Sequence, residues 1–585
     1  MYPSSSSSPR KTSEGFSSSR SSERYDSQIV YRICRARILA KLDEAPVGTL
    51  HVRIWLTCGL GFLAASYENF VANLILPLLY HVNYPTLTAQ PGEDPYQLPS
   101  DFPSRHPDSD AWMKASILWG NLVGQISFGY LADRYGRRAV FSSTMIIMIV
   151  CTIGSAFSAS AIRGANILQT LAVWRFFLGI GIGGDYPLSA IITSEFANVK
   201  WRGTMIAAVF AMQGIGILTG GLVTLATLAA LQNSIRSDPA YLDLVWRIIL
   251  AFGVIPAMGA VYFRLTIPET PRYTVDVIGS VDQAERDVEK VMALNATRDV
   301  SSNWVGEEVA NGTRANVKKG GFWAHFGQWK NGKILFGCAF TWFALDVAWY
   351  GLSLNASTIL TLINWNGSNS LPPYDNYWQK TVGQVIIACM GTVPGYWVCV
   401  ALIDRTGRLT LQGFGFAVIT VSLLILALFW ETIATRTVGF CVLYGLASFF
   451  FQCGPNATTF ILPAELFPTP FRARAYGIAA AMGKLGAIIG VQIFSPIFAS
   501  NLDVCLYCFA GVMALGGMAT LLVPETNGVA LETLEVISAK KIQMGPALAG
   551  AQRETVEELA SEFLISRDLE ASPSQIDNIF TDWSV

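Results

Sequence analysis

The chain has few charged side chains for its length, and this is the first limit on what it can be. Only 14% of its 585 residues are Asp, Glu, Lys or Arg, while 52% are hydrophobic. Soluble domains carry about 25% charged residues. One soluble core cannot absorb so large an apolar surplus, so most of it is expected to face lipid. A formal net charge of −1 gives no basis for binding nucleic acid.

Clusters of metal ligands and of catalytic side chains are also missing. The ten cysteines are scattered, and Cys505 and Cys508 form a CxxC without a second pair. Neither a zinc site nor a disulfide framework is therefore expected, and no cofactor is predicted. Gly179, Gly181 and Gly184 match GxGxxG, but they lie inside an apolar run with no preceding strand, which excludes a dinucleotide site. No loop carries a nucleophile–base set, so an enzyme is not expected.

What the chain does have is a series of apolar runs long enough to cross a bilayer. Exposed backbone cannot stay unpaired in hydrocarbon, so each run is expected to be a helix. The twelve runs lie near residues 54–79, 111–131, 139–160, 168–193, 204–230, 245–266, 334–360, 380–402, 411–431, 436–462, 474–499 and 503–523. The predicted fold class is therefore an all-α membrane protein with twelve transmembrane helices.

The distribution of Lys and Arg predicts the orientation of these helices. Residues 1–53 carry nine Lys and Arg, whereas the first loop, 81–110, carries only Arg105. The positive-inside rule then places the N-terminus in the cytoplasm, and twelve spans return the C-terminus to the same side. Asn366, in the predicted outer loop 361–376, is a candidate for glycosylation, while the sequons at Asn295 and Asn311 should face the cytoplasm.

These features divide the chain into five predicted parts. Residues 1–48 are Ser-rich and basic without the apolar core of a signal peptide, so a disordered cytoplasmic tail is expected. The other parts are an N-terminal six-helix half (49–266), a cytoplasmic linker (267–333), a C-terminal six-helix half (334–523) and a cytoplasmic C-terminal tail (524–585).

Three motifs recur further along the chain, the first two of them about 270 residues on, which indicates an internal repeat. GYLADRYGRR is matched by ALIDRTGR, SEFANVKWRG by AELFPTPFRA, and the tripeptide PET occurs twice. Two parallel six-helix halves are therefore predicted, with a substrate site between them near the midplane. A single motif of this kind could simply set topology, but together they predict a cytoplasmic latch between the halves. Its candidate residues are Asp133, Arg134, Arg137, Glu195, Arg202, Asp404, Arg405, Arg408, Glu465 and Arg472.

Two carboxylates lie in the middle of apolar runs, Asp185 in the first half and Asp346 in the second. A charge at bilayer depth costs at least about 2.5–3.5 kcal/mol and usually marks an ion or substrate path. The repeat also makes Tyr186 equivalent to Asn456, and Gln213 equivalent to Lys484. Polar groups are therefore expected to converge on one cavity from both halves, which is typical of a transporter.

Four segments resemble the fungal and plant proton-coupled phosphate transporters of the major facilitator superfamily. They are GIGIGGDYPLSAIITSEFAN, FRLTIPETPRYTVDV, WFALDVAWYGLSLN and GPNATTFILPAELFPT, within a resemblance over about residues 40–530. It implies a phosphate:proton symporter of the plasma membrane that works by alternating access, with phosphate, protons and the lipid bilayer as partners. The substrate-binding residues that it implies are Tyr186, Gln213, Trp342, Asp346, Tyr350 and Asn456, to which Lys484 can add a positive charge.

The residue chemistry fits this implied role. Tyr and Trp donors and the amides suit phosphate oxygens, and a protonated Asp346 would also donate. Trp342 and Tyr350 lie four residues on either side of Asp346, so all three share one helical face, although helix packing would also explain the aromatic residues. The proton-coupling candidates are Asp185, Glu68, Asp346 and Arg175. For Arg175 the alternative is a static ion pair between the first and fourth helices.

One position departs from the family pattern. The family's first helix usually carries an aspartate in a TDAYD or TDAYE run, and here the run is AASYE, with Ala65 at that place and Tyr67 and Glu68 retained. Two other functions therefore stay open. One is transport of another anion or a phosphorylated metabolite, including export, and the other is a phosphate sensor with little transport.

Overall fold

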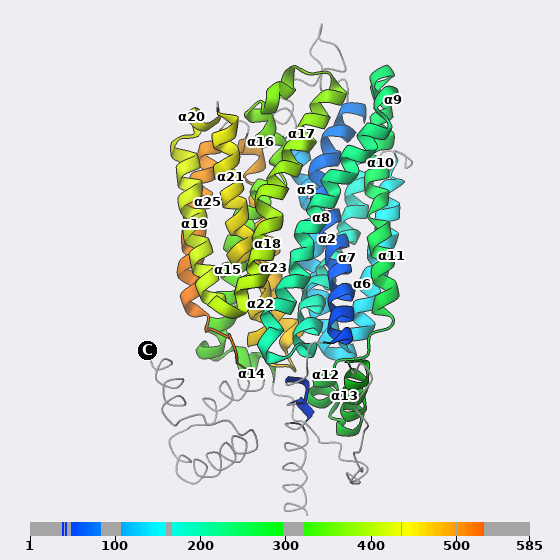
Figure 1. The fold of residues 1–585 in the computed structure, drawn as a ribbon, viewed down its shortest axis with the longest axis vertical. Coiled ribbons are helices and arrows are strands. Elements are labelled where there is room, and N and C mark those ends of the chain that lie inside the picture. The colour runs from blue at the N-terminus through cyan, green and yellow to red at the C-terminus, as the bar shows by residue number, and fades with distance from the viewer. Residues whose placement is uncertain are drawn as a thin grey trace, which may run out of the picture. The chain divides into compact units, whose positions relative to one another are not determined.

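The protein is described by a computed structural model that covers residues 35, 38–39, 41–43, 48–83, 107–159, 167–295, 321–434, 436–498, 501–529 and 531. Residues 1–530 form one compact unit and residues 531–585 a second, of which only Leu531 is described. The first unit is a bundle of long helices (Figure 1).

The first half of the bundle is built from six long helical segments. They are α2 (Thr49–Asn83), α5 (Pro107–Tyr135), α6 (Arg137–Ala156), α7 (Ile167–Phe196), α8 (Arg202–Ala230), and α10 (Leu242–Phe252) followed by α11 (Val254–Arg264). Short elements join them, namely η1 (Val199–Trp201), α9 (Gln232–Ser237) and η2 (Pro239–Tyr241). Most of the apolar stretch of α2 is buried, so this helix lies inside the bundle.

The second half repeats this arrangement. Its long segments are α15 (Trp329–Ser353), α17 (Pro373–Ile387) with η5 (Ala388–Thr392) and α18 (Val393–Thr406), α19 (Arg408–Leu428), α21 (Thr437–Phe451) with η6 (Gln452–Asn456) and α22 (Ala457–Leu466), α23 (Arg472–Gln492), and α25 (Leu502–Ala519) with η7 (Thr520–Leu522). The connecting elements are α16 (Ala356–Leu362), η4 (Trp365–Ser370), α20 (Trp430–Ala434) and α24 (Ser495–Phe498). Exposed Asn366 lies in η4.

Eleven helical segments among the described residues are long and apolar enough to cross a membrane. The predicted second span, within α5, is not one of them, because its ends are charged and its middle carries the polar residues Asn121 and Gln125. Both of these side chains are buried, since α5 packs along α7 on one side and α23 on the other. The described residues therefore form twelve long helical segments, as predicted, and one of them, α5, is less apolar than the others.

The two halves meet along two helix pairs, α5 with α23 and α8 with α18. Glycines allow the first pair to approach closely, because a Cβ added at Gly129 would lie 2.6 Å from the carbonyl oxygen of Ala473. At Gly477 it would lie 2.3 Å from the carbonyl oxygen of Gln125. Close packing of small residues is a common way for membrane helices to associate.

Short helices gather at one end of the bundle, which we call the motif end because the repeated charged motifs lie there (Figure 1). Within the predicted linker 267–333 they are α12 (Pro271–Tyr273), η3 (Thr274–Ile278), α13 (Val281–Asn295) and α14 (Phe322–Phe326). Asn295 is therefore the last residue of α13, and Asn311 lies outside the described residues.

Part of the predicted disordered tail, residues 1–48, is ordered, and that prediction is wrong for this part. Ile38, Leu39 and Leu42 are helical and buried. Arg35 donates two hydrogen bonds to the carboxylate of Asp276, at 2.5 and 3.0 Å. Three apolar side chains on a short amphipathic stretch provide enough burial to hold this segment, a local signal that the Ser-rich composition of the tail concealed.

Candidate functional site

An ion pair between Asp346 on α15 and Lys484 on α23 forms the centre of the candidate site. The Lys484 Nζ donates to Asp346 Oδ2 at 2.9 Å and to the Tyr350 hydroxyl at 2.8 Å. All three side chains are about 1% exposed. The two helices come close because α23 carries glycines, and a Cβ at Gly486 would lie 2.3 Å from the carbonyl oxygen of Phe343.

The first half reaches this ion pair through Tyr186 on α7. The Lys484 Nζ lies 4.2 Å from the ring centroid of Tyr350 and 5.1 Å from that of Tyr186, a distance within cation–π range. Trp342, one turn before Asp346 on α15, is 1% exposed and packs edge-on against Tyr476 at 5.7 Å. Four of the predicted substrate residues and Lys484 are therefore brought together where the halves meet.

Asn456 lies in η6, which packs against α15, and Gln213 lies on α8, which packs against α22. The Asn456 amide donates to the Tyr396 hydroxyl at 3.0 Å and to Gln452 Oε1 at 2.6 Å, both within the second half. The position of Asn456 is set by η6. In this element Cys453 and Gly454 have non-helical backbone angles, which break the tenth predicted span. Broken helices of this kind often form substrate sites in transporters.

Gln213 on α8 is 1% exposed, and its Oε1 has no hydrogen-bond partner within the described ranges. The ring of Phe210, one turn earlier, lies 5.5 Å from that of Tyr396. A buried amide oxygen without a partner is costly, so it indicates a position where a ligand or water can bind.

Asp185 lies inside the first half and pairs with Arg264, a residue that the sequence interpretation did not select. Arg264 Nη2 donates to Asp185 Oδ1, while Nη1 donates to the Phe141 carbonyl at 2.8 Å and to Thr144 Oγ1 at 3.1 Å. Both charged side chains are at most 1% exposed. Arg264 falls within the predicted span 245–266, so the argument that selected Asp185 could also have found Arg264.

Glu68 and Arg175 form a second buried charge group between α2 and α7. Arg175 Nη2 donates to the backbone oxygen of Glu68 at 3.0 Å and its charge also acts on the Glu68 carboxylate. Glu68 Oε1 accepts from Thr152 Oγ1 at 3.1 Å, and Oε2 has no hydrogen-bond partner among the described residues. Arg175 thus contacts the first predicted helix from the fourth. This is where the alternative interpretation, a static ion pair between these two helices, would place it.

Ala65 is fully buried one turn before Asn69 on α2. The Asn69 amide donates to the Ala65 carbonyl at 3.0 Å, and Asn121 on α5 donates to Asn69 Oδ1 at 3.0 Å. The position that carries a charge in the resembled family is therefore uncharged here, and neutral amides lie next to it.

At the motif end, the two repeated aspartates make equivalent contacts across the halves. Asp133, on α5, accepts from the backbone N–H groups of Ala473 and Arg474 at 3.3 and 2.9 Å, in the first turn of α23. Asp404, on α18, accepts from the backbone N–H of Thr204 at 2.7 Å, in the first turn of α8. A carboxylate at a helix N-terminus pairs with unsatisfied N–H groups and the helix dipole, so each aspartate holds the other half.

A second group of buried charges strengthens this end. Glu195 Oε1 lies 3.1 Å from Arg472 Nη1 in the other half and 3.5 Å from Arg137 Nη2. Its Oε2 accepts from the Thr270 hydroxyl at 2.6 Å. Glu195 therefore connects α6 and the segment that contains Thr270, both in the first half, with α23 in the second half.

The remaining motif residues differ in their roles. Arg408 pairs with Glu465 at 3.0 Å within the second half, and Arg202 donates to the Val529 carbonyl at 3.0 Å and lies 3.4 Å from Asp43. Arg134 and Arg405 are exposed, and no bond between halves involves either within the described residues. Arg134 and Arg405 directly follow Asp133 and Asp404 in the chain, but their side chains point away from the contact between the halves.

The repeated PET tripeptides contribute equivalent helix caps. Glu269 accepts from the backbone N–H groups of Arg137 and Arg138 at 3.2 Å each, and Glu525 accepts from those of Arg408 and Leu409 at 3.1 and 2.9 Å. Burial raises the pKa of the Glu269 carboxyl. The described residues contain no group of three or more His, Cys, Asp or Glu side chains that could hold a metal ion.

These features define a class of protein: a multi-pass membrane transporter of two six-helix halves, with a buried charged cluster between them. The family model "Sugar (and other) transporter" matches residues 60–537. Solved structures agree on the fold. The proton:xylose symporter XylE, of the major facilitator superfamily, superposes with a TM-score of 0.66 at 22% identity, covering 83% of this chain and 98% of that chain. A partially occluded inward-open form of XylE from E. coli gives a TM-score of 0.60 at 20% identity, covering 82% and 99%.

Much closer relatives are found among fungal and plant proteins. The repressible high-affinity phosphate permease of Neurospora crassa is 37% identical over 527 residues, 86% of this chain and 89% of the relative. Inorganic phosphate transporter PHO84 of Saccharomyces cerevisiae is 37% identical over 533 residues, 86% of each chain. Inorganic phosphate transporter 1-1 of Oryza sativa is 37% identical over 528 residues, 85% and 96%. The chain belongs to the sugar (and other) transporter family, together with these fungal and plant relatives.

Proposed function

We propose that this protein imports inorganic phosphate together with protons, by alternating access of the site between its two halves. Relatives named as phosphate transporters, at 37% identity over most of the chain, support the substrate. The observation that carries the proposal is the buried Asp346–Lys484 pair with the Tyr350 hydroxyl, because it combines a protonatable group, a cation and a neutral donor.

Phosphate binding would rearrange this cluster. Lys484 would turn from Asp346 toward the phosphate oxygens, and Asp346 would accept a proton so that it no longer repels the anion. The hydroxyls of Tyr186 and Tyr350 and the indole N–H of Trp342 are neutral donors for the remaining oxygens. Gln213 and Asn456 would add amide donors from the two sides. Loss of the Asp346 proton would restore the pair with Lys484 and weaken phosphate binding.

The buried charges of the first half would carry the coupled proton. Protonation of Asp185 would release it from Arg264, and Glu68, beside Arg175, has a carboxylate oxygen without a hydrogen-bond partner in the described part of the chain. A neutral residue at position 65 leaves two carboxylates for this path. Each has a cationic neighbour, so a change in its protonation changes the electrostatic contacts between α2, α7 and α11.

The motif end would be the cytoplasmic end, which places both termini in the cytoplasm and Asn366 on the outside as a glycosylation candidate. The excess of Lys and Arg before α2 supports this orientation. The latch formed by Asp133, Asp404 and Glu195 would then open for release of phosphate into the cell. The plasma membrane is the membrane in which such import is needed.

The test is uptake of radiolabelled phosphate by proteoliposomes, with and without an inward proton gradient. Accumulation that depends on the gradient supports the symporter and means that Ala65 is compatible with coupling. We expect Asp346→Asn to abolish this accumulation, because the side chain can no longer exchange a proton. Full proton-driven uptake by Asp346→Asn would overturn the mechanism.

The neutral residue at position 65 favours one second candidate, a transporter of another anion or of a phosphorylated metabolite. If folded wild-type protein moves no phosphate, this candidate replaces the first. If organic phosphates compete with phosphate uptake, the substrate class is broader than inorganic phosphate. Phosphate flux without any dependence on the gradient would indicate exchange in place of symport.

A further inference from the structure

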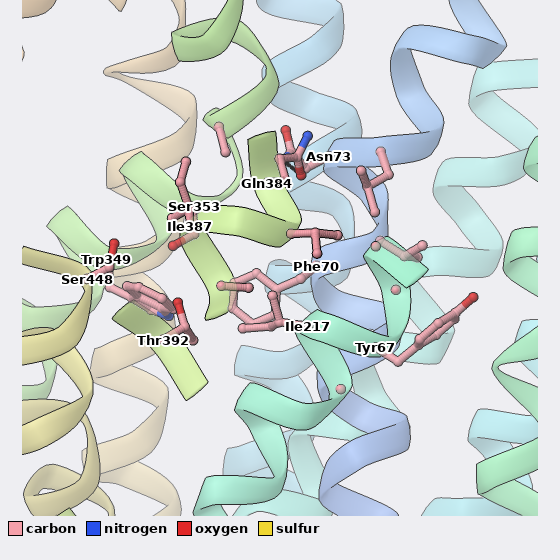
Figure 2. Close-up of a pocket in the computed structure, with 18 of the residues that line it drawn as sticks. Tyr67, Phe70, Asn73, Ile217, Trp349, Ser353, Gln384, Ile387, Thr392 and Ser448 are labelled. Atoms are coloured by element: carbon pink, nitrogen blue, oxygen red, sulfur yellow. Dashed lines mark hydrogen bonds between the residues drawn. The ribbon is translucent and has the colours of Figure 1, made fainter. Parts of the chain in front are cut away.

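A pocket lies between the halves (Figure 2). Its lining residues Trp349 and Ser353 follow Asp346 along α15, which places the pocket on the side of the Asp346–Lys484 pair that faces away from the motif end. Residues of α2 and α8 line it from the first half, and residues of α15, α17, η5 and α21 line it from the second. The described residues that line it include hydroxyl, amide and aromatic side chains but no Asp, Glu, Lys, Arg or His. The pocket is therefore uncharged, unlike the candidate site beside it.

An aromatic side chain separates this pocket from the charged cluster. Phe70 lines the pocket, and its ring stacks on that of Tyr350 at 5.4 Å between centroids, with a second contact to Trp349 at 6.0 Å. Tyr350, which does not line the pocket, accepts the hydrogen bond from Lys484. A rotation of Phe70 would therefore connect the pocket with the ion pair.

A neutral hydrogen-bond network closes the opposite end of the pocket. Asn73 Nδ2 donates to Gln384 Oε1 at 2.8 Å, and Gln384 Nε2 donates to Ser357 Oγ at 2.8 Å, which joins α2 to α16 and α17. Figure 2 shows Asn73 and Gln384 next to each other at one end of the pocket, with Phe70 further inside. The pocket thus lies between two closures, each made of a few side chains.

One lining side chain indicates that the pocket holds a hydrogen-bond acceptor. Trp349 is 4% exposed, and its indole Nε1–H has no partner within the part of the chain that the structure describes. Ser448 and Thr392, which carry hydroxyl groups, also line the pocket (Figure 2). A buried donor without a partner costs free energy, so its retention in the wall of a pocket that also has hydroxyl groups favours a ligand oxygen in this pocket.

We propose that this pocket is a transit site, in which the transported anion pauses between the outer solution and the Asp346–Lys484 pair. This inference rests on the proposed function and extends it. Donors without a cation replace part of the hydration shell of phosphate but hold it weakly. Weak binding is what a transit site needs, because an anion bound tightly there would not move on to Lys484. The outer network and Phe70 would open in turn on either side of the anion.

The test compares Trp349→Phe, which removes the donor and keeps most of the ring, with the control Trp365→Phe. Trp365 is equally buried at 5% exposed and also has an indole N–H without a described partner, but it does not line the pocket. Two quantities are measured in parallel: the half-saturating phosphate concentration for uptake by proteoliposomes, and the equilibrium Kd of purified protein for phosphate.

We expect Trp349→Phe to raise the half-saturating concentration about tenfold, since the lost hydrogen bond is to an anion, and to leave the Kd within about twofold. Trp365→Phe should change neither. An unchanged half-saturating concentration in Trp349→Phe overturns the proposal, and a parallel rise in Kd places Trp349 at the central site and also overturns it.

Two further results keep the outcomes distinct. If Trp349→Phe does not fold, Thr392→Val gives the same test, because it removes a hydroxyl that lines the pocket and keeps nearly the same side-chain shape. An unchanged half-saturating phosphate concentration in Thr392→Val would again overturn the proposal. If wild-type liposomes move no phosphate, the proposed function itself fails and the transit site fails with it. If wild-type and Trp365→Phe liposomes transport normally and Trp349→Phe does too, only the transit site fails.

Discussion

The Asp185–Arg264 ion pair lies against α2 at Gly61. A Cβ at Gly61 would lie 1.9 Å from Arg264 Nη2 and 3.2 Å from Asp185 Oδ2. The first separation is far shorter than a van der Waals contact, so Gly61→Ala must displace the guanidinium. We expect this one added methyl group to break the buried ion pair.

The displacement is costly because Arg264 is held on several sides. Nη1 is bonded to Phe141 and Thr144, the guanidinium carbon lies 3.6 Å from the centroid of the Phe141 ring, and the side chain is 1% exposed. Moving it leaves Asp185 as a buried charge without its partner, which costs about 3–5 kcal/mol. For a chain of this length such a loss lowers Tm by about 2–4 °C.

The assay is thermal unfolding of the purified protein in detergent, with Gly259→Ala as the matched control. Gly259 lies on α11, one and a half turns before Arg264, and a Cβ there would meet nothing within 4 Å. Its replacement by Ala should leave Tm unchanged or raise it slightly, since Ala favours helix.

The decisive comparison repeats Gly61→Ala in a protein that already carries Asp185→Asn and Arg264→Ala. With the guanidinium gone, the added methyl should lower the free energy of unfolding by less than about 1 kcal/mol, and the difference between the two backgrounds measures the coupling. An equal loss of Tm in both backgrounds would show that Gly61 acts elsewhere, and it would refute the reasoning.

Two further predictions concern the motif end. Glu195→Gln removes the anion shared by Arg137 and Arg472, so we expect at least about tenfold slower phosphate uptake by proteoliposomes, and an unchanged rate would speak against the latch. Gly477→Leu places a side chain where α23 meets α5, so closure at this end should fail, with transport lost and equilibrium phosphate binding retained. Gly511→Leu, at a position where a Cβ would meet nothing within 4 Å, is its control, and equal behaviour of the two would contradict this account.

Much of the fold could be predicted from the sequence because bilayer physics leaves few choices. Long apolar runs must be helices, and the repeated motifs indicated two equivalent halves, which the fold and the family confirm. The repeat also made Asp133 and Asp404 equivalent, but the predicted latch did not specify that they would accept from backbone N–H groups of the other half. It did not separate these aspartates from Arg134 and Arg405, which follow them directly, because the direction of a side chain depends on helix rotation.

The candidate site was predictable in its residues but less so in its contacts. Asp346, Tyr350 and Lys484 were all selected from the sequence, and Lys484 lies within hydrogen-bond distance of the other two. Their roles in transport stay predictions. The break in the helix at η6 sets the direction in which the Asn456 amide donates its hydrogen bonds. No local sequence pattern indicated Tyr396 as the acceptor.

The sequence by itself determined the class of protein, the number of membrane helices and the positions where charge enters the membrane, because each follows from composition and spacing along one chain. Only the tertiary structure decided which charges pair. Arg264 lies far from Asp185 in the chain, and they meet because Gly61 leaves room for the guanidinium beside α2. Such a pairing depends on how helices cross and which positions lack a side chain, and both are set by packing across the whole bundle.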